Sequence, residues 1–293
     1  MSKPALSSLL ALAVAVAACS KPHPKPPPSR GANESLEPAL SAAEVQRIVK
    51  AVRAARGVAL KREVNIEMLS KSEFRRELAK RLEGDAATHE LSLDDAFLVG
   101  FDFVPPPAKR GELAPMAEVL AEQVAAFYDS EVDKVFVPRT EKATAKQAIM
   151  DRVILAHEIQ HALQAQNFPR PSRERRSSDE ELAQLALFEG DAMVAMGAFM
   201  GAELGAPVGR TLRRIRETVE SVPRDALAHR AEDKVLARAI ELARHRLSFP
   251  YEEGMFFVSD IYRAGGFPLV DAAFERPPRS TEQVLHPEKY LRD

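Results

Sequence analysis

Apolar and polar residues follow a helical spacing along most of the chain. Between Leu36 and Arg56 the apolar side chains recur every three or four positions, and Gly57 follows, which predicts an amphipathic helix that ends there. The same reasoning predicts further helices over residues 72–82 (closed by Gly84), 91–99, 111–122, 144–166 (closed by Pro169), 180–200, 208–221 and 225–247. The many arginines in the segments 208–221 and 225–247 indicate solvated helix faces.

Three short stretches have the pattern of strands instead. Within residues 58–69 the apolar side chains of Val64, Ile66 and Met68 alternate with polar ones, as on a half-buried strand. Segments 124–128 and 135–137 are short, apolar and separated by the turn-forming residues 129–131, which predicts a hairpin. The predicted fold class is therefore α+β, mostly helical, with a small mixed sheet beside the helix at 144–166.

That helix contains the motif His-Glu-Ile-Gln-His at residues 157–161. On an α-helix, positions i and i+4 lie on one face, so His157 and His161 can direct two imidazoles at one ion. Zinc accepts neutral imidazole, and Glu158 could take a proton from water that the ion acidifies. The alternative is a pair of surface histidines, but the apolar residues around the motif favour a buried site.

A catalytic zinc needs a third protein ligand, and two glutamates are candidates. Glu189 stands among apolar residues in a predicted helix, where a carboxylate needs a partner. Glu181 ends the stretch Ser178-Asp179-Glu180-Glu181, which reads as a capping box, so it is the weaker candidate. Gly190 indicates close helix packing. Asp191 could hydrogen-bond a ligand histidine, although a solvent-facing or capping role is the alternative.

Together these motifs resemble the gluzincin branch of zinc metallopeptidases, in which H-E-x-x-H is followed by an E-G-x-A segment on a second helix. The segments HEIQHALQAQNF, LALFEGDA and FPYEEGMFFV are similar to a group of bacterial peptidase-like proteins, and the resemblance covers roughly residues 120–290. It implies a zincin-like fold, one zinc ion held by His157, His161 and Glu189, and Glu158 as the catalytic base. The helix-to-helix spacing differs from that of thermolysin, so the resemblance does not extend to substrate subsites.

Peptide hydrolysis also needs a donor for the developing oxyanion, and two residues remain open for this role. Tyr251 follows Pro250 at a predicted helix start, from which it could face a cleft. His286 lies in a predicted polar loop near the C-terminus. Packing or loop-bracing roles are the alternatives, and Gly265-Gly266 predicts a turn between the two positions.

Composition adds one exclusion. The chain has 293 residues with 41 Lys and Arg against 43 Asp and Glu, a net charge of −2, so no basic excess indicates a nucleic-acid partner. The hydrophobic share of 45% is enough for a core, which we expect to form one domain over residues 36–293.

The N-terminus predicts membrane attachment. Residues 1–18 combine Lys3 with a short apolar run, as in a secretory signal. The run ends Val-Ala-Ala before Cys19, the single cysteine, which resembles a bacterial lipobox in which that thiol is acylated. Residues 19–35 are rich in proline and predict an extended tether. Ser20, next to Cys19, resembles the residue found in lipoproteins that are sorted to the outer membrane and not retained at the inner one. The alternative is an ordinary signal peptide with an unrelated cysteine.

The sequence thus predicts a lipid-anchored zinc metallopeptidase of the bacterial cell envelope, acting on a peptide or protein substrate. Two alternatives stay open. One is a zinc hydrolase of a non-peptide amide or ester, and the other is a non-catalytic lipoprotein that binds zinc.

Overall fold

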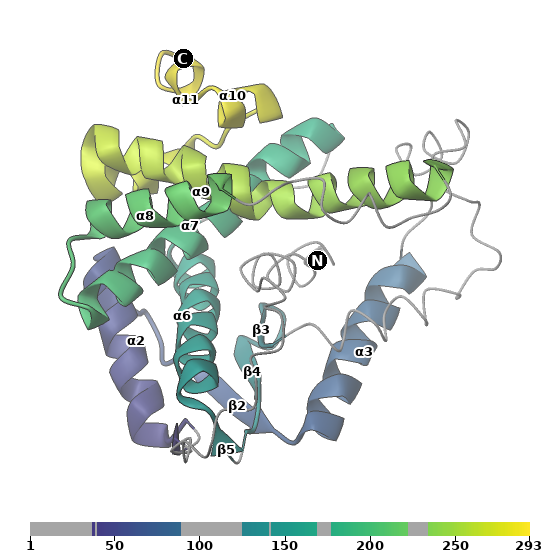
Figure 1. Ribbon diagram of the computed structural model, residues 1–293, viewed down its shortest axis with the longest axis vertical. Helices are drawn as coiled ribbons and strands as arrows, with labels where there is room; N and C mark the ends of the chain where they lie inside the picture. The colour runs from purple at the N-terminus through teal and green to yellow at the C-terminus, as the bar shows by residue number, and fades with distance from the viewer. Residues whose placement is uncertain (1–36, 39, 89–124, 141, 169–176, 222–233) are drawn as a thin grey trace, which may run out of the picture.

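A computed structural model describes residues 37–38, 40–88, 125–140, 142–168, 177–221 and 234–293 (Figure 1). This part of the chain is mostly helical with one small mixed sheet of three strands, which confirms the α+β class. The signal segment, Cys19, the tether and the helices expected at 91–99 and 111–122 lie outside the described residues.

The first helix, α2 (Ala42–Arg56), ends where its sequence predicts, but it begins at Ala42 and not near Leu36, because Glu37–Pro38 form a short strand. The Ser41 side chain accepts a hydrogen bond from the backbone N–H of Glu44, and Gly57 ends the helix in a left-handed conformation with φ of 76°. The next helix, α3 (Lys71–Thr88), continues past Gly84, so the stop predicted there is wrong. One glycine disfavours a helix by only about 1 kcal/mol, which need not end it.

The three-stranded sheet has the order β2-β4-β3. Strand β2 (Asn65–Leu69) pairs in parallel with β4 (Lys134–Pro138), and β3 (Phe127–Asp129) pairs antiparallel with β4. This confirms the predicted hairpin and leaves β3 at an edge of the sheet. Two further short strands, β1 (Glu37–Pro38) and β5 (Lys142–Ala143), pair with each other.

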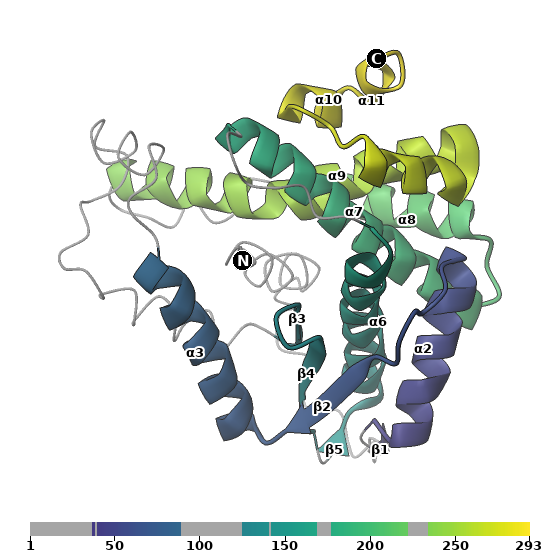
Figure 2. The ribbon, with the colours of Figure 1, turned by 180° about the vertical axis from the view of Figure 1, so that it is seen from behind.

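Helix α6 (Ala145–Asn167) lies at the centre, between α2 and the sheet, and both views show this arrangement (Figures 1 and 2). Thr144 caps its N-terminus by accepting from the backbone N–H of Gln147. Helix α7 (Ser178–Glu203) crosses the end of α6 and packs on one side against α9 (Lys234–Glu275). The H-E-x-x-H motif is thereby enclosed by the sheet and two long helices.

Helix α9 differs from its prediction. It runs through Pro250, so Tyr251 lies within a helix and not at a helix start. The break comes at Gly266, whose φ of 68° and ψ of −166° are not helical, in agreement with the turn predicted at Gly265-Gly266. The chain ends in two short helices, α10 (Thr281–Leu285) and α11 (Pro287–Tyr290).

Two glycines let α7 and α9 come into backbone contact. A Cβ atom added at Gly190 would lie 2.1 Å from the carbonyl oxygen of Gly254, and one added at Gly254 would lie 2.2 Å from that of Ala186. The close packing predicted for Gly190 is therefore confirmed. Helix α7 is long and apolar enough to cross a membrane, but most of its apolar window is buried inside the fold, as is typical of a core helix.

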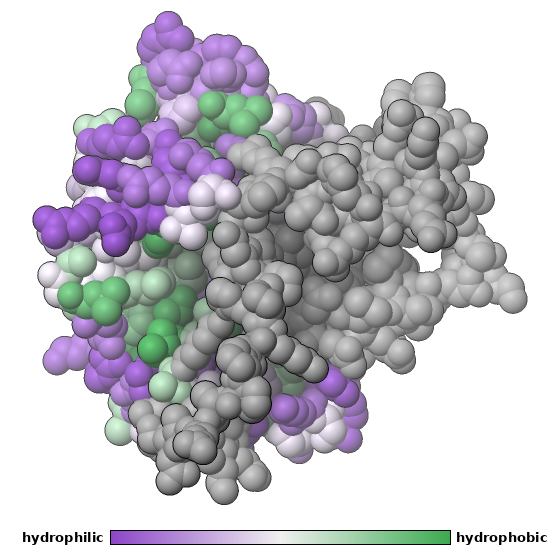
Figure 3. Space-filling model, viewed as in Figure 1, coloured by the Kyte–Doolittle hydropathy of each residue, from purple (hydrophilic) through white to green (hydrophobic). Residues whose placement is uncertain are grey.

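The surface helix α8 (Val208–Glu220) shows the opposite distribution of side chains. It buries Leu212, while Arg210, Arg213 and Arg214 are exposed, as the arginine pattern predicts. The visible surface near α8 is correspondingly hydrophilic (Figure 3).

Candidate metal centre

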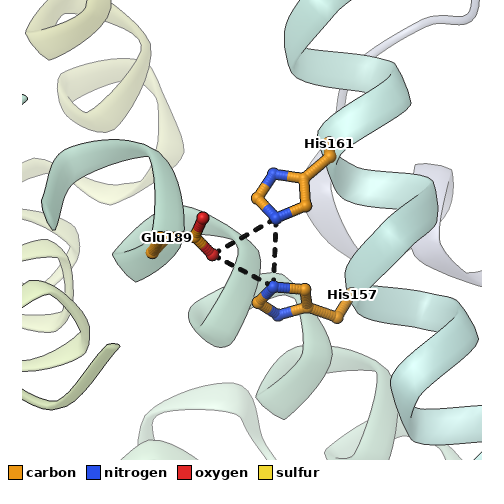
Figure 4. Close-up of side chains that lie close together, drawn as sticks. All are labelled: His157, His161 and Glu189. Carbon is orange, nitrogen blue, oxygen red and sulfur yellow. Dashed lines mark hydrogen bonds and ion pairs between the residues drawn. The ribbon is translucent and has the colours of Figure 1, made fainter. Parts of the chain in front are cut away.

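Three side chains from α6 and α7 converge at the centre of the fold. His157 and His161, one turn apart on α6, point toward Glu189 on the facing helix (Figure 4). The two Nε2 atoms are 3.0 Å apart, and each lies 3.3 Å from Glu189 Oε2. His157 and Glu189 are buried, while His161 keeps 14% of its side chain exposed. The structure therefore brings together the three residues that the sequence predicts as ligands.

These separations fit a zinc ion. Ligand atoms held tetrahedrally at about 2.0–2.1 Å from an ion lie roughly 3.3–3.4 Å from one another. The three observed distances approach that value, and the set of two imidazoles and one carboxylate is a donor set that zinc accepts. His161 Nδ1 lies 2.9 Å from Gln164 Oε1, which can only accept a hydrogen bond, so Nδ1 must carry the proton of the neutral ring. The other nitrogen, Nε2, then has a free lone pair that faces the site.

Charges within this cluster are strongly coupled. Burial acts to raise the pKa of Glu189, but the two histidines outweigh it and lower that pKa to about 2. Burial acts to lower the pKa of His161, but the charge of Glu189 raises it to about 9. For His157, burial dominates and lowers the pKa. Without a metal ion the carboxylate is thus ionised, and a proton on His161 balances it.

Glu158 lies beside the three ligands without joining them. Its Oε2 accepts a hydrogen bond of 2.8 Å from the backbone N–H of Tyr128, which belongs to the edge strand β3. Burial raises the pKa of Glu158 to about 7. A carboxyl group with such a pKa can both take up and release a proton near neutral pH.

The two candidate oxyanion donors lie in different environments. Tyr251 is fully buried, and its ring stacks on that of His157 with centroids 6.1 Å apart. Burial, followed by the charge of Glu189, raises the pKa of its phenol well above the ordinary value, so the group remains a hydrogen-bond donor. His286 stands at the C-terminal end of α10, with 48% of its side chain exposed beside Glu282 and Glu288. The structure therefore brings Tyr251, and not His286, to the ligands.

Glu181, the second candidate for the third ligand, is exposed on the first turn of α7. The capping box assigned to Ser178 and Glu181 is off by one residue. The cap is Ser177, whose side chain accepts from the backbone N–H of Glu180 at 3.1 Å. Two adjacent serines make the frame ambiguous in sequence, and the helix begins after the first of them.

Asp191 is fully buried, which excludes the solvent-facing role weighed for it. Its carboxylate is held by Gln160, Gln164 and Arg56, and Gln164 in turn contacts His161. Sequence reasoning missed these three residues. The available signal was that each glutamine follows a motif histidine by three positions, which places it on an adjoining stripe of α6.

Comparison with other proteins leaves the functional argument to this geometry. The resemblance to gluzincins rests on short motifs, and the structure brings His157, His161 and Glu189 of those motifs together in space. No protein-family model matches the chain, and searches of curated proteins and of solved structures found no match.

Proposed function

We propose that this protein is a zincin-like metallopeptidase that uses one zinc ion to hydrolyse peptide bonds. The observation that carries the proposal is the convergence of His157 Nε2, His161 Nε2 and Glu189 Oε2 at 3.0–3.3 Å, with Glu158 next to them. Three protein ligands with a separate buried carboxylate are typical of a catalytic zinc site, whereas structural zinc sites are usually closed by four protein ligands.

The protein's own residues would share the chemistry as follows. Zinc bound at the three ligands would supply Lewis acidity and bring the pKa of water near 7. Glu158 takes a proton from the attacking water and passes it to the leaving amine, a dual role that suits its pKa of about 7. Tyr251 donates a hydrogen bond to the oxyanion, because its phenol stays neutral and its buried ring stacks on that of the ligand His157.

The sheet supports a peptide as substrate. Strand β3 lies at the sheet edge, and it touches the site directly through the backbone N–H of Tyr128 and the carboxylate of Glu158. An extended peptide could add to such an edge by main-chain hydrogen bonds, which would bring a peptide bond alongside Glu158. This arrangement favours a peptidase over a hydrolase of small esters.

We further propose that the protein is anchored through acylated Cys19 in the bacterial cell envelope, at the outer membrane. The lipobox-like end of the signal segment and the proline-rich tether support this location. Replacing Cys19 with Ser should move the protein from the membrane fraction to the soluble fraction. A Cys19→Ser chain that still sediments with membranes would contradict the anchor.

The enzymatic proposal is tested by Glu158→Gln. The amide oxygen can still accept from the N–H of Tyr128, so we expect about one zinc per chain to remain. Digestion of a peptide library should slow by roughly 10²–10⁴-fold, because only the proton-transfer group has changed. The exposed residue Glu181 provides the control, since Glu181→Gln should leave both zinc content and turnover unchanged.

Two outcomes would overturn the peptidase assignment. If the wild type binds zinc and cleaves model esters or amides but no peptide, the protein is a different zinc hydrolase. If it binds zinc and turns over neither class, it is a zinc-binding envelope lipoprotein. Full turnover by Glu158→Gln would remove Glu158 as the base.

A further inference from the structure

A second cluster of polar side chains lies behind the candidate metal centre. Asp191 of α7 is fully buried, and its Oδ2 accepts hydrogen bonds from Gln160 Nε2 at 2.7 Å and Gln164 Nε2 at 2.8 Å. Its Oδ1 accepts from Arg56 Nε, at the C-terminal end of α2, at 2.7 Å. Side chains from three helices therefore meet on one carboxylate.

Hydrogen bonding fixes the orientation of the Gln164 amide. Its Nε2 donates to Asp191 Oδ2 and, at 2.8 Å, to the backbone carbonyl of Phe188. Both partners only accept, so the amide nitrogen has to face α7 and cannot exchange places with the oxygen. The oxygen is thereby directed at His161 Nδ1, 2.9 Å away, and requires a proton on that nitrogen.

The arginine holds this arrangement in place from the far side. Arg56 has no exposed surface, and its guanidinium bridges Asp191 and Asp271, with its Nη2 2.6 Å from Asp271 Oδ1. It also lies over the ring of Phe267, 4.5 Å from the centroid. A rigid, charged fork of this kind sets the position of the carboxylate to which Gln164 is bound.

The other ligand histidine has no equivalent support in the part of the chain that the structure describes. There, His157 Nδ1 is buried and has no hydrogen-bond partner, and its ring is placed by stacking on Tyr251. Of the two ligand histidines, therefore, only His161 has its ring orientation fixed by a hydrogen bond among the described residues.

We propose that Gln164 is the positioning residue of the metal centre, and that Arg56 and Asp191 act through it. Gln164 selects the tautomer of His161 that presents Nε2 to the ion and fixes the plane of the ring. The inference rests on the proposed function only in that His161 is a metal ligand. It holds for a peptidase, another hydrolase or a non-catalytic zinc protein alike.

Gln160 provides a matched control within the same helix. It is as buried as Gln164 and donates to the same oxygen of Asp191, but its side chain contacts no histidine among the described hydrogen bonds. Replacing either glutamine with Met keeps most of the side-chain volume and removes one hydrogen bond to Asp191. The two variants therefore differ in the contact with His161 and in the hydrogen bond to the Phe188 carbonyl, which only Gln164→Met loses.

The test measures zinc affinity of the full chain, purified in detergent and stripped with a chelator, by competition with a chromophoric chelator. Gln164→Met should bind zinc about 10–100-fold more weakly, the usual effect of losing an outer partner of a ligand histidine. Gln160→Met should stay within about threefold of the wild type, since no ligand loses a partner. Equal affinity for wild type and Gln164→Met, or equal losses in both variants, would overturn the proposal.

A second readout separates positioning from general destabilisation. Cobalt substituted for zinc should give a changed visible absorption spectrum in Gln164→Met and an unchanged one in Gln160→Met, because the spectrum reports ligand geometry. If Gln164→Met does not fold, Gln164→Asn serves instead. Its amide is one methylene shorter and cannot reach both helices, so affinity should again fall, and a wild-type affinity and spectrum would overturn the proposal.

These measurements also separate this inference from the proposed function. A wild type that binds no zinc would refute both. A wild type that binds zinc tightly but cleaves nothing would refute the peptidase alone, and the Gln164 comparison would still decide the positioning role.

Discussion

Helix α6 carries two pairs of polar side chains at the same spacing, and the two pairs meet different partners. His157 and His161 face the carboxylate of Glu189, and their nitrogens approach its oxygen to 3.3 Å. Gln160 and Gln164 face the carboxylate of Asp191 and donate amide hydrogens to it. Both pairs are thus directed from α6 at an acid on α7.

The difference lies in hydrogen-bonding capacity. Each glutamine is a donor that meets an acceptor, so the carboxylate of Asp191 is satisfied by protein groups alone, although Gln160 Oε1 and Arg56 Nη1 have no partner among the described residues. In the other cluster, Gln164 directs the Nε2 lone pair of a neutral His161 at an oxygen that also only accepts, and such a buried pair needs a cation or a proton between its atoms. The raised pKa of His161 indicates that a proton takes this place in the metal-free protein. Two similar pairs on one helix therefore distinguish an ion site from a structural network.

The largest effect should come from removing the acid of the ion site. Glu189→Gln eliminates the negative ligand, so zinc affinity should fall by more than the roughly 100-fold typical of an outer partner. Metal analysis after dialysis would show close to one zinc in the wild type and nearly none in the variant. Glu181→Gln on the same helix should retain the metal, and retention by Glu189→Gln would contradict the ligand assignment.

The next effect concerns the structural network. Arg56→Met would leave the buried carboxylate of Asp191 without its cation, which should lower the free energy of unfolding by about 3–5 kcal/mol. Denaturant unfolding of the metal-free protein measures this directly. Arg53→Met, one turn earlier on an exposed position of α2, should change stability by less than about 0.5 kcal/mol. Equal stabilities for the two variants would show that Arg56 is dispensable.

The sequence predicts a feature well when the residues that make it are close together along the chain. The histidine pair, the hairpin and the C-terminal end of α2 depend on residues a few positions apart, where helical and strand periods apply. The preference for Glu189 over Glu181 came from the apolar residues around it. Arg56 pairs with a residue 135 positions away, and no local pattern announces such a contact.

The errors in the helices have a related cause. Gly84 and Pro250 disfavour helix locally, yet α3 and α9 continue through them. For Pro250, the surrounding segment is buried against α7, and tertiary packing outweighs the lost hydrogen bond. Gly266 does break its helix, because there the backbone adopts a positive φ.

A smaller effect tests the close packing of α9 against α7. In Gly254→Ala the new methyl group would meet the backbone of Ala186 and push α9 away from α7, so stability should fall by about 1–3 kcal/mol. Gly209→Ala, where nothing lies within 4 Å of the added atom, should be neutral or stabilising by up to about 1 kcal/mol. Thermal unfolding of both variants checks the difference, and equal midpoints would contradict the close contact.

The smallest effect is the number of protons released when zinc binds. It tests the idea that, in the metal-free protein, a proton on His161 takes the place of the ion. Zinc takes neutral His161, whose pKa in the metal-free protein is about 9, so binding below that pH must displace a proton. From this value, the proton released by His161 should fall from about 0.9 at pH 8 to about 0.2 at pH 9.5. Calorimetric titration with zinc in buffers of different ionisation enthalpy measures the count. Water on bound zinc ionises with a pKa of about 7 and water on aqueous zinc with a pKa of about 9, so the protons released from water also decrease over this range. An NMR titration of the His161 ring in the metal-free protein therefore assigns the fall to the histidine, and it should give a pKa of about 9. A ring that titrates near the ordinary histidine pKa would show that His161 is already neutral at pH 8, and its proton would not be the charge that balances Glu189.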